Sequence, residues 1–123
     1  MSKFMIKSMD SYSDKNYEIV RGEVKHSDDW TIYNYVSKLG ECEIHFSDRR
    51  VIISRKGEIP TVIDVDLDKS TEFFYVTKEM RKKFTVSGEK ITRDSETGIV
   101  EFSYKLYDNN IEINKITISI KNY

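Results

Sequence analysis

The sequence predicts an all-β protein, an antiparallel meander of about eight to ten strands in a single domain that covers residues 1–123. Runs of alternating apolar and polar residues recur along the chain, and clusters of turn-forming residues separate them. Several longer runs also change their alternation by one residue, which indicates β-bulges. Bulged strands curve, so the sheet is expected to close into a barrel, with a two-layer sandwich as the alternative.

The strand runs and turns follow each other in order. ECEIHF places Cys42, Ile44 and Phe46 on one face, and IVEFSYKLY alternates in the same way over residues 99–107. Turns are predicted at residues 26–29, 47–49 and 94–98, and at the pair Asp108-Asn109. TKEMRKKF, at residues 77–84, allows at most one short helical turn.

The last run, IEINKITISIKNY, contains isoleucines at both odd and even positions. A straight strand would direct the two sets to opposite faces. We therefore predict a bulge at Asn114-Lys115 that brings all five isoleucines onto one core face: Ile111, Ile113, Ile116, Ile118 and Ile120. A second change of alternation lies near Gly88, between Val86 and Ile91.

The composition excludes some classes of partner and compartment. The net charge is −1 although 33% of the residues are charged, so neither nucleic acid nor a membrane surface is an expected partner. Cys42 is the one cysteine, and the first residues lack the apolar core of a signal peptide. We expect a bacterial protein of the cytoplasm, without disulfides, that is a monomer or a weak homodimer.

A row of three aspartates suggests a metal site at first sight. Asp64, Asp66 and Asp68 alternate, so their carboxylates share one face of a strand, as ligands of a hard cation would. Lys69 and Tyr75 stand where a calcium loop needs glycine and glutamate. We therefore predict a solvent-facing row and no metal site.

A thiol nucleophile is equally unsupported. Cys42 and His45 are three residues apart and point to opposite faces of a strand, so Cys42 is expected to be a small core residue. No phosphate loop or serine-hydrolase motif occurs. No catalytic residue and no cofactor is predicted, and a non-enzymatic function is favoured. The basic run at residues 78–83 is expected to be solvated, with a phosphate-bearing partner as the alternative.

Several short motifs, in this order, resemble the YwiB-like family of small bacterial proteins, domain of unknown function 1934. They are the opening FMIKSMDSYSDKNYEIVRGEV, Arg55-Lys56-Gly57, Tyr75 with Thr77, and the closing GIVEFSYKLYDNNIEINKITISIK. Met80 stands near the place of an expected glycine, and VIDVDLD replaces a basic-aromatic strand. The resemblance implies a calycin-like (lipocalin-like) β-barrel and no established activity.

The first functional hypothesis is that one open end of the barrel binds a small, partly apolar ligand. Arg55 shares the alternation of Val51 and Ile53, so it should be partly buried and need an anionic partner. That partner is either a structural carboxylate or a ligand. Arg55 and Tyr75 would be polar anchors, with Trp30 and Tyr104 as the apolar wall.

The alternative hypothesis is a protein–protein interaction module. Tyr33, Tyr35 and Tyr107 alternate oppositely to the apparent core residues of their strands, so they are expected on the outer face. Exposed tyrosines are favoured at interfaces.

Overall fold

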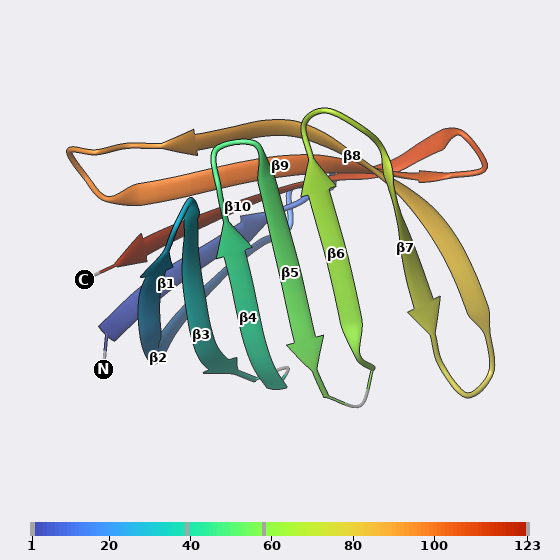
Figure 1. Cartoon of the computed structure of the whole chain (residues 1–123). Helices are drawn as coiled ribbons and strands as arrows, with labels where there is room; N and C mark the ends of the chain where they lie inside the picture. The colour runs from blue at the N-terminus through green and yellow to red at the C-terminus, as the bar shows by residue number, and fades with distance from the viewer. Residues whose placement is uncertain (1, 39, 58, 123) are drawn as a thin grey trace.

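The protein folds into ten β-strands, which a computed structural model describes over residues 2–38, 40–57 and 59–122 (Figure 1). In chain order the strands are β1 (Ser2–Met9), β2 (Lys15–Ser27), β3 (Trp30–Ser37), β4 (Gly40–Phe46), β5 (Arg50–Lys56), β6 (Thr61–Asp66), β7 (Thr71–Val76), β8 (Arg81–Arg93), β9 (Ile99–Asp108) and β10 (Ile111–Asn122).

The strands form one antiparallel sheet in the order β6-β5-β4-β3-β2-β1-β10-β9-β8-β7. Every strand pairs with its neighbour in the chain except β6 with β7, and β1 pairs with β10. The sheet therefore consists of two meanders, β1–β6 and β7–β10, and Figure 1 shows it curving into a nearly closed barrel. The predicted all-β barrel is confirmed.

The region where one helical turn was allowed is not helical. Residues 77–80 form a turn, in which the Thr77 N–H donates to the Met80 carbonyl at 2.8 Å, and β8 begins directly after it. Among the described residues, no helix is long and apolar enough to cross a membrane.

The core is the inner face of the curved sheet. Alternation predicts this face correctly in β4 and β9, and Cys42 is a buried core residue as expected. Phe4, Phe46 and Phe102 are the largest of the fully buried side chains. The inner face combines residues from all parts of the sheet, including Val20, Ile44, Val51, Ile53, Ile63, Val65, Phe73, Val86, Val100, Tyr104, Ile118 and Ile120.

The seam between β6 and β7 lacks a strand ladder. Side chains and close packing join the sheet there instead, because the Thr71 hydroxyl donates to the Asp64 carbonyl. Gly88 of β8 lies against the Asp66 carbonyl, and a Cβ atom at this position would come within 2.6 Å of the oxygen. A glycine is therefore required where β8 approaches β6. The β8 bulge lies next to it, between Gly88 and Lys90, as the changed alternation predicted.

The last strand contains the predicted bulge, one residue earlier than expected. The register of β10 with β9 shifts between Glu112 and Asn114, so Ile113 is the extra residue. The bulge brings Ile116, Ile118 and Ile120 onto the core. Ile111 is 68% exposed and Ile113 lies outside the core cluster, so the prediction is wrong for these two residues. The β1 ladder on β10 ends at Thr117, which leaves the tip of the β9–β10 hairpin beyond the core.

The turn between β1 and β2 completes the hydrogen bonding of this bulge. The Ser11 N–H and hydroxyl both donate to the Asn114 side-chain oxygen, at 3.1 and 2.9 Å. The Lys115 N–H donates to the Ser11 hydroxyl at 2.6 Å, and the Tyr12 hydroxyl donates to the Ile113 carbonyl at 3.1 Å. Residues distant in sequence thus pair the backbone groups that the bulge leaves outside the ladder.

The predicted outer face of β3 is wrong. Tyr33 and Tyr35 are only 6% and 9% exposed and point into the barrel. Pairing of Ser37 with Gly40 sets Tyr33 opposite Ile44 and Tyr35 opposite Cys42, and directly paired residues share a face. Both faces of β3 carry apolar side chains, so alternation alone could not identify the inner one. Because two of its three tyrosines are buried, the tyrosine-bearing interaction face is not supported.

Two turns also refine the predictions. The β9–β10 hairpin turns at Asn109-Asn110, which both have positive φ angles (49° and 67°), one residue after the predicted pair. Asparagine tolerates this left-handed conformation, which a two-residue hairpin turn requires. Gly98 ends the β8–β9 turn with φ 73°, as predicted.

Candidate functional site

One end of the barrel contains a cavity of about 450 Å³, which we call the mouth. It lies where the two meanders meet, because its walls come from β1 and β10 on one side and from β6 and β7 on the other. The lining residues include Asp10, Asp14, Arg55, Ile63, Phe73, Tyr75, Tyr104, Leu106, Asn114 and Ile116. Three of the four residues predicted to bind a ligand, Arg55, Tyr75 and Tyr104, are therefore brought together.

Arg55 is the cation of the mouth. It pairs with Cys42 across β4 and β5, and it follows Val51 and Ile53 on the inner face, so its side chain is directed inward and partly buried. Among the described residues, no carboxylate forms an ion pair with the Arg55 guanidinium and no group forms a hydrogen bond with it. The structural carboxylate that the sequence left open as its partner is therefore not found in this part of the chain.

Two buried tyrosines lie in the field of Arg55. Burial raises the pKa of Tyr104 to about 12, and the charge of Arg55 partly opposes this rise. Burial likewise raises the pKa of Tyr35, again against the effect of Arg55. Tyr104 is only 2% exposed, and its hydroxyl makes no hydrogen bond within the described chain. Both phenols stay protonated at neutral pH, so each can donate a hydrogen bond.

A second, smaller cavity of about 160 Å³ adjoins the first. Arg55, Ser8, Asn16 and Ile118 line both cavities, and Tyr35 lines the smaller one. Arg55 therefore lies between two hollows. The walls around it are mainly aromatic and aliphatic, as in sites that hold small, partly apolar molecules.

Trp30 lies elsewhere, at the opposite end of the barrel. It precedes the inward residue Thr31 and packs edge-on against His45, with ring centroids 6.0 Å apart. It lines a different cavity of about 610 Å³, whose other walls are His26, Asp28, Asp29, Thr31, Ser47, Asp48, Arg49 and Arg93. The prediction is wrong for Trp30 because this residue begins β3, and the start of the strand lies at the end of the barrel away from the mouth.

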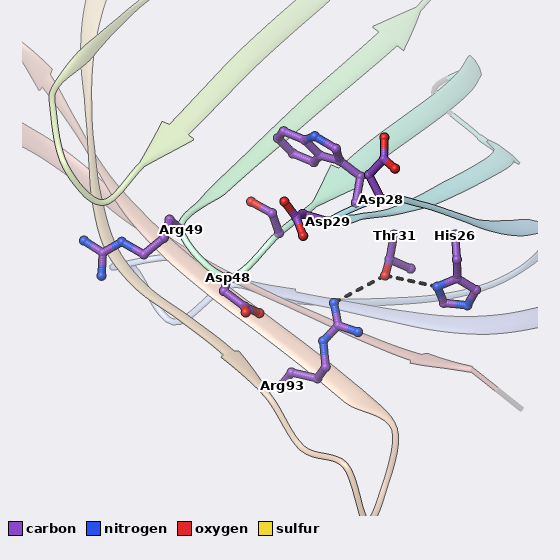
Figure 2. Close-up of a pocket in the computed structure, with 9 residues that line it drawn as sticks. His26, Asp28, Asp29, Thr31, Asp48, Arg49 and Arg93 are labelled. Carbon is purple, nitrogen blue, oxygen red and sulfur yellow. Dashed lines mark hydrogen bonds between the residues drawn. The ribbon is translucent and has the colours of Figure 1, made fainter.

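The two arginines of this second end, both drawn in Figure 2, have partners within the protein. The Arg93 guanidinium lies 5.3 Å from the centre of the Phe46 ring and donates to the Thr31 hydroxyl at 3.3 Å. The same hydroxyl lies 3.4 Å from His26 Nδ1. Arg49 pairs with Asp68, which holds the pKa of that carboxyl below its usual value.

Other candidates from the sequence have structural partners. In the aspartate row, Asp64 pairs with Arg50 at 2.7 Å, and Asp66 accepts a hydrogen bond from the Asp68 N–H at 2.8 Å. No set of side chains suited to a metal ion occurs in residues 2–38, 40–57 and 59–122. Cys42 and His45 lie on opposite faces of β4, as expected.

Half of the basic run is neutralised by acidic residues. Lys82 pairs with Asp108 at 2.7 Å, and Lys83 pairs with Glu72 at 3.5 Å.

Several residues of the mouth and of the smaller cavity beside it were not predicted from the sequence. Tyr35 was placed outside, although the short β3–β4 connection could have set it opposite Cys42. Asp10, Asp14 and Asn114 carry no sequence signal for this location. They reach the mouth only because the β1–β2 turn packs on the β10 bulge, a contact between distant segments.

Comparisons with known proteins agree with the fold. The model of a family described as "Domain of unknown function (DUF1934)" matches residues 6–120. The crystal structure of the ywiB protein from Bacillus subtilis is similar, with a TM-score of 0.71 and 17% identity over 99% of this chain and 91% of that one. At this identity the likeness concerns the fold alone. No curated protein matches the chain. Since the family match spans nearly the whole sequence, the chain belongs to the DUF1934 family.

Proposed function

We propose that this barrel binds a small, partly apolar anion at its mouth. The observation that carries the proposal is the inward guanidinium of Arg55, which has no ion-pair partner among the described residues. A cation in a partly buried site is stabilised by a hydrogen-bonded anion, and a guanidinium holds a carboxylate or phosphate with two parallel hydrogen bonds.

The surroundings of Arg55 suit such a ligand. Tyr104 would donate a hydrogen bond to the same anion, because burial keeps its hydroxyl protonated. Tyr75, Phe73 and Leu106 would contact the apolar part of the molecule. The volume of about 450 Å³ lies within the range of small-molecule sites, roughly 300–1,000 Å³.

A thermal-unfolding screen tests the proposal. The probes are alkyl carboxylates and alkyl phosphates of graded length, with the matching alcohols as uncharged controls. A ligand present at a hundredfold its dissociation constant adds about 2.7 kcal/mol to the free energy of unfolding, so its effect on Tm is easily measured. We expect shifts with the anions and none with the alcohols.

Two variants locate the site. Arg55→Met keeps much of the volume of the side chain and removes the charge, so it should abolish the shift. Arg93→Met makes the same change at the opposite end and should leave the shift intact. The proposal is wrong if no anion raises Tm, or if Arg55→Met responds like the parent protein.

A further inference from the structure

The charges that line the mouth differ between its interior and its rim. Arg55 is the one cationic side chain among the described residues that line the mouth, and it lies on the inner face of β5. The carboxylates of this lining are Asp10 and Asp14, in the turn that follows β1. A molecule that fills the cavity would therefore meet a positive charge inside and negative charges at the entrance.

The turn that contains the rim carboxylates is held in a defined position. One oxygen of Asp10 accepts hydrogen bonds from the N–H groups of Tyr12 and Asp14, at 2.9 and 3.1 Å. The hydrogen bonds of Ser11 and Tyr12 to the β10 bulge fix the whole turn to the barrel. Because the turn is already ordered, Asp14 can meet a ligand without the entropic cost of ordering a loop.

The two rim carboxylates differ in whether their oxygens are already hydrogen-bonded within the protein. Asp10 uses one oxygen to form its own turn. Asp14 forms no hydrogen bond or ion pair with its carboxylate among the described residues, and its side chain is exposed at the edge of the cavity. Asp14 is thus the group that can receive a cation from a bound molecule, while it disfavours a second negative charge there.

The stretch between the two charges is apolar. Leu106 and Ile116 line it together with Phe73 and the ring of Tyr75. These side chains offer no strong donor or acceptor apart from the Tyr75 hydroxyl, so they match methylene groups or an aromatic ring.

From this arrangement we propose that the ligand is a zwitterion with an apolar middle, whose anionic end meets Arg55 and whose ammonium end meets Asp14. The inference rests on the proposed function, which concerns only the anionic end. It adds a chemical class, that of ω-amino acids and related amino carboxylates, and a direction of binding.

Isothermal titration calorimetry of the full chain tests the class. The probes are ω-amino carboxylates of graded chain length, each compared with the alkyl carboxylate of the same length. An exposed ammonium–carboxylate pair contributes little, so we expect the amino compound of the best length to bind about threefold more tightly. A short one cannot reach both ends and should show no such preference.

Three variants test which residue contacts each end of the ligand. Asp14→Asn should remove the threefold preference and leave the affinity for alkyl carboxylates unchanged. Arg55→Met should weaken both classes by at least about tenfold, because it removes charged hydrogen bonds. Asp29→Asn is the matched control at the opposite end and should change neither.

The outcomes separate this inference from the proposed function. Equal binding of amino and alkyl carboxylates at every length, or an amino preference that persists in Asp14→Asn, overturns the zwitterion and leaves the anion site standing. Failure of both classes to bind overturns the two proposals together.

Discussion

The two ends of the barrel each present an inward-reaching arginine, and the two arginines have different surroundings. Arg93 lies over the Phe46 ring and donates to Thr31, so the protein itself provides partners for its charge. Arg55 lies between two cavities, and the described residues provide it with neither a carboxylate nor a hydrogen-bond acceptor. The larger cavity is at the Arg93 end, so volume alone would select the end opposite the mouth. The proposed site rests instead on the guanidinium that has no protein partner.

Deletion of Ile113 should have the largest effect on the free energy of unfolding, and the structural change should lie at the mouth. The deletion makes the pairing of β10 with β9 regular and removes the bend of the bulge, so the four hydrogen bonds between the bulge and the β1–β2 turn are lost. Each contributes roughly 0.5–1.5 kcal/mol, so we expect the free energy of unfolding in urea to fall by about 3 kcal/mol.

Deletion of Ser95 is the matched control, in the exposed β8–β9 turn at the other end, and should cost less than about 1 kcal/mol. Equal losses from the two deletions would show that the bulge has no special role in holding the mouth.

The pH dependence of stability should report Tyr104, a residue of the mouth. Its pKa is about 12 in the folded protein and about 10 when unfolded, so its contribution is complete below pH 10 and is lost as the pH rises towards 12. The free energy of unfolding should fall by up to roughly 2–3 kcal/mol over this range through Tyr104 alone.

Tyr104→Phe should lessen the alkaline loss of stability, whereas Tyr17→Phe, at an exposed position, should not. Tyr33 and Tyr35 also have raised pKa values, so part of the loss should remain. An unchanged pH profile in Tyr104→Phe would contradict the buried, protonated phenol beside Arg55.

The smallest expected effects on stability come from replacing the two arginines, and they test most directly whether the surroundings of these arginines differ. Arg93→Met removes a cation–π contact and a hydrogen bond, so it should lower the free energy of unfolding by about 1 kcal/mol. Arg55→Met removes a partly buried cation without a protein partner, so stability should stay the same or rise by up to about 1 kcal/mol. Urea unfolding at neutral pH, without ligand, measures both. A loss in Arg55→Met as large as in Arg93→Met would remove the difference between the ends.

Much of the fold could be predicted because alternation fixes the faces of strands with one apolar side. Cys42, Ile44 and Phe46 are buried as the pattern required. The facing of β3 could not be read in this way, because both of its sides are apolar, and pairing with β4 decided it. The bulge in β10 was predictable from the isoleucines, but its position at Ile113 depends on partners in the β1–β2 turn.

The site was harder to predict than the fold. Alternation indicated that Arg55 and Tyr104 face inward, and this is correct. That β5 and β9 present these residues to one cavity follows from barrel closure, which no local pattern encodes. Trp30 was assigned to the same wall as an interior aromatic, but it begins β3 and lies at the opposite end of the barrel.

The pairing of β1 with β10 has a consequence for the order of folding. Nearly all other ladders join strands that are neighbours in the chain, so each meander can form from local contacts, whereas Phe4 and Asn122 pair across almost the whole sequence. Contacts of such long range form slowly, because a large loop must close first. The mouth is lined by both meanders, so it can exist only after this step. A nascent or partly folded chain would have its hairpins before it had anywhere to hold a ligand.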